Sequence, residues 1–136
     1  MSITAYTADD SLDADIIEVC IYGNVEEVED LISRCADVNA TDKNRNTPLH
    51  IASLNGHASV VDMLLKNGAN VNATNIYMDT PLHYTSSNRH ASVVDMLLKN
   101  GANVNATNKN METPLHIASV RGQYSDVEIL LKNGAV

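Results

Sequence analysis

The sequence predicts an all-α solenoid, a stack of helix-turn-helix units joined by extended loops. Thr-Pro-Leu-His occurs three times with a spacing of 33 residues, at 47–50, 80–83 and 113–116. Asn-Gly-Ala recurs with the same spacing, and residues 57–75 are identical to residues 90–108. Self-similarity at a fixed period of this length is typical of stacked repeats, in which each repeat is one supersecondary unit.

A fourth, divergent unit is expected at the N-terminus, over residues 9–41. Shifting the pattern back by 33 residues aligns Gly23 with Gly56, and residues 38–41 repeat the Val-Asn-Ala-Thr of the later units. Ala-Asp-Ile-Ile replaces Thr-Pro-Leu-His there, and acidic residues crowd the second helix. A solenoid needs such a polar end unit as a cap. Residues 1–8 are expected to be a tail.

Three regular units are expected at residues 42–74, 75–107 and 108–136, all within one solenoid domain. In each, the threonine of Thr-Pro supplies an N-cap hydroxyl, and the proline takes the first helical position, where no N–H is needed. Gly56 can close the first helix in a left-handed conformation, and Gly68 can end the second. One unit buries too few aliphatic side chains to stand alone, so its neighbours must complete the core.

The charge of the chain argues against a nucleic-acid partner. The formal net charge is −8, which repels a phosphate backbone. Residues 1–42 carry eleven acidic residues and one arginine (−10), whereas residues 43–136 carry six acidic and eight basic residues (+2), which sums to −8. We interpret the acidic residues as the solvated face of a cap helix rather than as a general acid/base pair. Those of the second helix are Glu26, Glu27, Glu29 and Asp30.

Cysteine usage and hydropathy predict a cytoplasmic or otherwise intracellular protein. Cys20 and Cys35 have neither CxxC spacing nor a matching histidine set, so we expect reduced thiols and no zinc site. No signal peptide opens the chain and no apolar run is long enough for a membrane helix. Non-classical secretion into a host stays open. Asn-Ala-Thr at Asn39, Asn72 and Asn105 matches a glycosylation acceptor, but we interpret it as a repeated turn.

The motifs resemble those of the ankyrin repeat family. The resemblance rests on Thr-Pro-Leu-His at the start of the first helix, Val-Val-x-x-Leu-Leu in the second, and Gly-Ala-x-Val-Asn-Ala after it, and it covers residues 9–136. It implies an L-shaped stack of about four repeats with hairpin loops that project to one side. It also implies a protein-protein interaction module that binds another protein on its concave face, formed by the hairpins and the first helices.

The chain departs from the family pattern in the hairpins and in the third unit. Arg89 stands where Gly56 ends its helix, and a non-glycine residue at positive φ costs roughly 1 kcal/mol. Thr85 and Ser86 replace a small apolar pair, so residues 75–107 are expected to form the least regular unit. The hairpin glycine of the family is also replaced, which predicts bulkier and less tightly turned loop tips. The replacing residues are Arg45, Met78 and Met111.

The repeated histidines His50, His83 and His116 are interpreted as structural rather than metal-binding or catalytic. Each follows a threonine N-cap at the third helical position, where its ring can bond the threonine hydroxyl or the hairpin backbone. The sequence contains no Gly-x-Ser-x-Gly, phosphate-binding glycine loop or His-Glu-x-x-His motif. We therefore expect neither an enzyme nor a cofactor.

Partner-binding residues are expected where the units differ, at the hairpin tips and the exposed ends of the first helices. Ile76, Tyr77 and Met78 are large side chains in a projecting loop with little core to enter, and Tyr77 is the best hot-spot candidate. Alternatively, Ile76 or Tyr77 packs on a neighbouring hairpin. Tyr84 could join this patch or pack inside. The full set of candidates is Lys43, Asn44, Asn46, Leu54, Asn55, Ile76, Tyr77, Met78, Asp79, Ser87, Asn88, Lys109, Asn110, Glu112, Val120 and Arg121.

An alternative function is that of a structural or self-associating fragment of a larger ankyrin-repeat protein, without a dedicated partner. The last unit ends soon after its second helix, and Asp126 replaces the valine of the other units, which suggests only a partial cap. We expect a monomer, with weak self-association through this face as the alternative. A more remote alternative is the regulatory part of an enzyme whose catalytic domain lies elsewhere.

Overall fold

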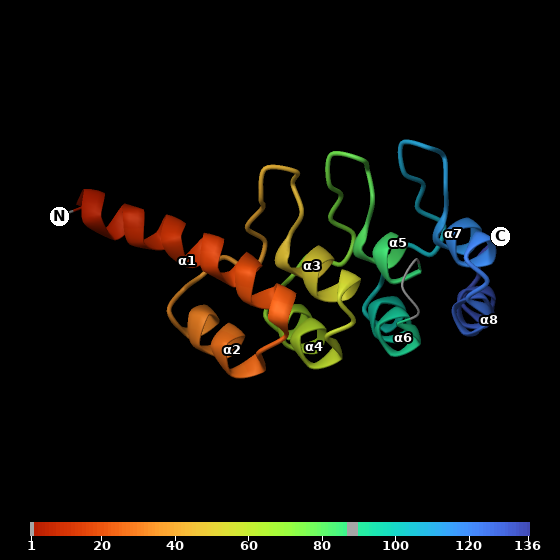
Figure 1. Cartoon of the computed structure of the whole chain (residues 1–136), viewed down its shortest axis with the longest axis horizontal. Coiled ribbons are helices and arrows are strands. Elements are labelled where there is room, and N and C mark those ends of the chain that lie inside the picture. The colour runs from red at the N-terminus through yellow and green to blue at the C-terminus, as the bar shows by residue number, and fades with distance from the viewer. Residues whose placement is uncertain (1, 87–89) are drawn as a thin grey trace.

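The computed structural model describes residues 2–86 and 90–136, and within these ranges the chain forms eight α-helices (Figure 1). Consecutive helices pair, so that the odd-numbered helices form one layer and the even-numbered helices a second. The four pairs follow one another in a row, which confirms the expected all-α stack. The helices are α1 (Ser2–Tyr22), α2 (Val25–Ser33), α3 (Pro48–Leu54), α4 (Ala58–Lys66), α5 (Pro81–Ser86), α6 (Ala91–Lys99), α7 (Pro114–Val120) and α8 (Tyr124–Lys132).

Packing between neighbouring pairs forms one continuous core. Along one layer α3 contacts α1 and α5, and α5 contacts α7, while the even-numbered helices pack in the same order. The identical sequences of α4 and α6 bury the same positions, and their methionines pack against this core. These helices therefore serve as stacking surfaces, as the repeat predicts. Their fully buried side chains are Val60, Val61, Leu64, Val93, Val94 and Leu97.

The expected caps set the ends of the first helices. The Thr47 side chain accepts a hydrogen bond from the backbone N–H of His50, and Pro48 takes the first helical position of α3. α7 begins in the same way at Thr113. Gly56 has a φ of 70°, the left-handed conformation expected at the turn between the two helices of a unit.

The N-terminal unit differs from expectation in the length of its first helix. α1 begins at Ser2 and continues to Tyr22, so residues 2–8 of the expected tail at residues 1–8 are helical. Residues 9–13 contain no proline, so each has a backbone N–H that can continue the helix. In the three regular units, by contrast, Thr-Pro sets the start of the first helix. No helix in the described ranges, α1 included, is long and apolar enough to cross a membrane.

The third unit holds polar side chains in its interior. Thr85 and Ser86 are fully buried, and both hydroxyls donate to the carbonyl oxygen of Leu82, at 3.0 and 2.8 Å. These bonds satisfy the two hydroxyls where the family has apolar residues. Arg89 lies outside the described residues, so the expected irregularity of this unit stays a prediction.

Candidate functional site

Three hairpins, at residues 42–46, 75–79 and 108–112, project from one side of the stack (Figure 1). One acidic or amide side chain closes the base of each hairpin. Oδ1 of Asp42 accepts the backbone N–H groups of Asn44 and Asn46, at 2.8 and 2.9 Å. Asn75 and Asn108 accept the corresponding N–H groups in the next two hairpins. A side chain that bonds backbone two and four residues ahead holds a turn tightly without help from a glycine.

The expectation of loosely turned hairpin tips is therefore wrong. Arg45, Met78 and Met111 take φ values of 64°, 63° and 62°, the left-handed conformation that glycine adopts without strain. In each hairpin the N–H of this residue donates to the carbonyl of the residue at the base, at 2.9 to 3.0 Å. The tips are bulky, as expected, but they are as sharply turned as glycine would make them.

Hydrogen bonds join the three hairpins into one row. The N–H of Ile76 donates to the carbonyl of Asn44, and the N–H of Lys109 donates to the carbonyl of Tyr77, both at 3.0 Å. The Asn108 side chain adds a bond from Nδ2 to the Asp79 carboxylate at 2.9 Å. The hairpins therefore present a continuous surface rather than three independent loops.

The hydrogen bonds expected of the repeated histidines are present at His50 and His83. Nδ1 of the buried His50 ring accepts the backbone N–H of Thr47 at 3.1 Å, so Nε2 carries the proton and donates to the carbonyl of Asp79 at 2.8 Å. His83 makes the same pair of bonds, with Glu112 as its acceptor. Desolvation by burial lowers the pKa of His50, consistent with a neutral ring. Each ring thus connects its unit to the next hairpin.

A groove of about 490 Å³ lies between the second and third hairpins and helices α5 and α7. Tyr84, His83 and Ile117 line it from the two helices, and Asn108 lines it from the base of the third hairpin. Seven of the expected partner-binding residues line this groove, so the structure brings together side chains from two hairpins and one helix end. They are Tyr77, Asp79, Lys109, Asn110, Glu112, Val120 and Arg121.

The groove combines exposed apolar side chains with hydrogen-bonded carboxylates and with cations that are not in ion pairs with the described residues. The Tyr77 side chain is 54% exposed and Val120 is 74% exposed, so both can be covered by a partner. The carboxylates of Asp79 and Glu112 accept the Asn108 amide at 2.9 and 3.0 Å, whereas the neighbouring cations form no ion pair with the described residues. The arrangement suits a polypeptide surface that buries the apolar groups and presents hydrogen-bonding groups around them.

Tyr84 both packs inside the stack and faces the groove. Its ring lies edge-on to His50 with centroids 5.6 Å apart. Its hydroxyl accepts Nδ2 of Asn75 at 2.6 Å and donates to Oδ1 of Asn46 at 3.2 Å. Burial raises the pKa of Tyr84, with a further contribution from the nearby Asp79 charge. Asn46, a sequence-based candidate, is therefore held by its own neighbours and is less available to a partner.

The remaining candidates lie outside this groove. Leu54 and Asn55 end α3 and are exposed, and the Asn55 amide donates to the carbonyl of Ile51. Lys43 and Asn44 belong to the first hairpin, while Ile76 and Met78 are exposed on the second. Ser87 and Asn88 lie outside the described residues, so their role stays a prediction.

The sequence analysis missed an inter-unit contact made by the Asn-Ala-Thr asparagines. Nδ2 of Asn72 donates to the carbonyl of Gly101 at 3.1 Å, and its Oδ1 accepts the N–H of Asn103 at 2.8 Å. Asn39 and Asn105 make the same two bonds with the units that follow them. Recurrence at the 33-residue spacing was the available signal, and it supports a structural rather than a glycosylated asparagine.

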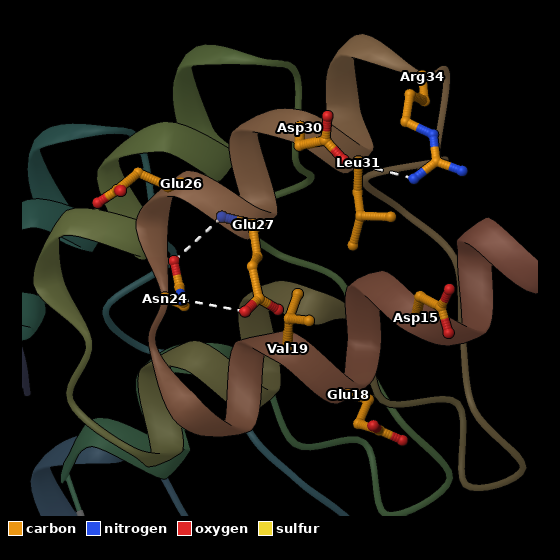
Figure 2. Close-up of a pocket in the computed structure, with 9 residues that line it drawn as sticks. All are labelled: Asp15, Glu18, Val19, Asn24, Glu26, Glu27, Asp30, Leu31 and Arg34. Carbon is orange, nitrogen blue, oxygen red and sulfur yellow. Dashed lines mark hydrogen bonds and ion pairs between the residues drawn. The ribbon is translucent and has the colours of Figure 1, made fainter.

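A second hollow lies between α1 and α2 and is rimmed by acidic side chains (Figure 2). Asn24 caps α2, because its Oδ1 accepts the N–H of Glu27 and its Nδ2 donates to Oε1 of the same residue, both at 3.1 Å. Arg34 pairs with Asp30 at 3.4 Å on the exposed surface. The acidic groups of α2 are exposed, in agreement with a solvated cap. Within the part of the chain that the structure describes, no three His, Cys, Asp or Glu side chains are grouped to hold a metal ion.

Comparison with known families identifies the repeat type. A model described as ankyrin repeats (many copies) matches residues 31–85, and one described as ankyrin repeats (3 copies) matches residues 74–136. No curated protein matches the chain. The two matches cover both the end of the divergent first unit and all three regular units. The stacked helix pairs and projecting hairpins agree with these matches, and the chain belongs to the ankyrin repeat family.

Proposed function

We propose that this chain binds a partner protein on its hairpin and first-helix face, with the groove beside Tyr77 as the centre of the contact. Ankyrin repeats are generally protein-protein interaction modules. One contrast carries the proposal. The stacking helices α4 and α6 have identical sequences, whereas most repeat positions that line the groove hold different residues in different units.

Position 77 makes this contrast concrete. The corresponding residues of the neighbouring hairpins are Asn44 and Asn110, so the hairpin fold does not require an aromatic side chain there. The hydrogen bonds of Tyr77 within the hairpin row come from its backbone, through its N–H to Asn75 and its carbonyl from Lys109. The exposed ring is thus available to a partner, and aromatic anchors contribute strongly to protein interfaces.

The proposed role is non-catalytic. Ankyrin repeat domains are typically non-catalytic, and the family matches include no catalytic family. Both carboxylates of the groove, from Asp79 and Glu112, are engaged by the amide of Asn108. A carboxylate committed to positioning a loop is poorly placed to act as a general base.

A comparison of two tyrosine variants tests the proposal. Tyr124 is an exposed tyrosine at the start of α8, away from the hairpins, so Tyr124→Ala is a matched control for Tyr77→Ala. We expect proteins captured by the wild-type chain from a cell extract to be retained by Tyr124→Ala and depleted at least about tenfold with Tyr77→Ala, since a hot-spot residue contributes more than about 1.4 kcal/mol. The melting temperature of Tyr77→Ala should stay within about 2 °C of wild type, because surface substitutions change stability by less than about 0.5 kcal/mol.

Two results would contradict the proposal. Equal capture by both variants would show that the groove is not the binding surface. A large fall in the melting temperature of Tyr77→Ala would show that the Tyr77 ring contributes to packing within the fold, as in the alternative that it packs on a neighbouring hairpin.

Self-association through the outer face of the α7–α8 pair is a second candidate function. His116 is exposed, whereas His50 and His83 at the same repeat position are buried against the next hairpin. Leu131 on α8 is 54% exposed on the same terminal unit. Sedimentation equilibrium over a wide concentration range tests this candidate, because a monomer at every concentration would remove it.

A further inference from the structure

A carboxyl group occupies an aliphatic position in the contact between the last two units. Asp126 on α8 corresponds to Val60 on α4 and Val93 on α6, both of which are fully buried in the stack. Asp126 is itself only 1% exposed. The terminal unit therefore buries an ionisable group at a place where the other units bury a methyl-bearing side chain.

Hydrogen bonding compensates only in part for this burial. The Oδ2 atom of Asp126 has no hydrogen-bond partner among the described residues. Asp126 lines a hollow of about 330 Å³ between Ala91, at the start of α6, and the residues from Gly122 to Ser125 around the start of α8. Burying a carboxylate without a partner is costly, and protonation or exposure to water relieves the cost.

No charged group of the described residues balances Asp126. α8 packs against α6 and α7, and no ion pair within the described residues joins Asp126 to a charged group of either helix. Lys99 is paired with Asp95 at 2.9 Å. Desolvation raises the pKa of Asp126 to about 6. The titratable or charged groups of these helices and their ends are His90, Asp95, Lys99, His116, Arg121, Tyr124, Glu128 and Lys132.

We infer that Asp126 makes the packing of α8 on α6 depend on pH. With the Asp126 carboxyl neutral, α8 stays packed on α6. With the carboxylate ionised, the start of α8 separates more often from α6, so that the carboxylate reaches water. This inference stands apart from the proposed partner binding, because it concerns only the contact between the last two units.

The direction of the effect follows from the two pKa values. An exposed aspartate has a pKa near 3.9, and the packed state raises that of Asp126 to about 6, so the packed state binds the proton more strongly. Packing is therefore strongest below about pH 4, weakens as the pH rises toward 6, and stays weakest above it. A difference of about two pKa units changes the ratio of separated to packed molecules by about 100-fold.

His50 has the opposite pH dependence, and its position allows the two effects to be separated. Its pKa is lowered, so protonation of the ring opposes folding as the pH falls below about 6.5. His50 lies in α3, two units away from α8. Measurements confined to α8 and α6 therefore report Asp126, whereas the stability of the whole chain reports both groups.

Hydrogen exchange of the full chain tests the inference. We expect the protection factors of α8 amides to fall by about 10-fold to 100-fold between pH 4.5 and pH 7.5 in the wild type, after correction for intrinsic exchange. Asp126→Val, which restores the residue of α4 and α6, and Asp126→Asn, which removes the charge, should both lose this change. Glu128→Gln removes an exposed charge from the same helix and should keep it.

Four outcomes would overturn the inference. The first is the same pH response in Asp126→Val as in the wild type, and the second is loss of the response in Glu128→Gln. The third is a carboxyl titration by NMR in the wild type that places the midpoint of Asp126 near 4 instead of 6. The titration needs no variant, so it decides the question even if a substitution at position 126 alters folding. A further variant is Arg89→Ala, at a position outside the described residues. An unchanged pH response of the α8 amides in this variant supports desolvation as the cause. Loss of the pH response is the fourth outcome that overturns the inference.

Discussion

Different positions in the hairpins have different roles: some fix the backbone of the turn, and others present side chains at the surface. At the turn tips, Arg45, Met78 and Met111 hold left-handed φ values, although each carries a side chain. The base residues Asp42 and Asn75 make this possible, because each fixes two N–H groups of its hairpin. Side chains on the rest of the loop are thereby free to vary without loss of the turn.

The left-handed tips should carry measurable strain. Met111 is 78% exposed, so Met111→Gly removes little packing but relieves the conflict between its Cβ and the positive φ. We expect Met111→Gly to raise the free energy of unfolding by about 0.5 to 1 kcal/mol, less any entropy that glycine adds to the unfolded chain. Met111→Ala keeps the Cβ and is the matched control. Urea denaturation measures both, and a gain with alanine equal to that with glycine would exclude backbone strain as the cause.

Residue roles could be predicted from the sequence only when the evidence was local. The N-cap of Thr47 and the bond between the Thr47 hydroxyl and the His50 ring follow from the three-residue spacing of the two residues within one helix start. The contacts of Asn72, by contrast, are made to residues about 30 positions away, and they depend on how one unit sits on the next. The burial of Asp126 depends in part on the neighbouring unit, because Ala91 of α6 lines the same hollow and α8 packs on α6.

At the scale of elements, side-chain bonds between connectors supplement the packing of helices. Asn39, Asn72 and Asn105 each reach across to the following unit through both their amide nitrogen and their amide oxygen. These bonds hold the loops in register with one another. The helices are then aligned both by their apolar flanks and by their connectors.

Removing one of these asparagines should weaken the coupling between units. Asn72→Ala deletes two hydrogen bonds at the boundary of the second and third units, and we expect a loss of about 1 to 2 kcal/mol. Asn110→Ala changes an exposed hairpin asparagine whose side chain forms no such bond with the described residues, so it should change stability by less than about 0.5 kcal/mol. Equal losses in urea denaturation would show that the bonds of Asn72 contribute nothing specific.

The elements themselves were largely predictable, and the exceptions have physical reasons. The Thr-Pro starts and glycine ends of the regular units place α3, α4, α7 and α8 where the pattern expects them. α1 continues to Ser2 because no proline or hairpin precedes its core residues, and the repeat register could not show this. The missing glycine at the hairpin tips predicted loose turns. The turns are tight because Asp42, Asn75 and Asn108 at the hairpin bases accept backbone N–H groups of the loops.

At the scale of the whole molecule, the four helix pairs form a scaffold in which the stacking interior is repeated in sequence and the hairpin row is variable. The stacking interior repeats the same residues, as α4 and α6 show. The hairpin row, which projects from one side of the stack (Figure 1), changes in sequence from unit to unit. The groove lies between its second and third hairpins. The groove could not be located from the sequence, because its walls come from two hairpins and two helices, but seven of its lining residues were among the candidates.

Site-specific photocrosslinking tests the central claim most directly. A benzophenone side chain is placed at position 77 in one protein and at position 124, the exposed tyrosine of α8, in another. Illumination in a cell extract should give discrete protein adducts from position 77 that are absent from position 124. No adduct at position 77, or the same adducts from both positions, would contradict binding in the groove beside Tyr77.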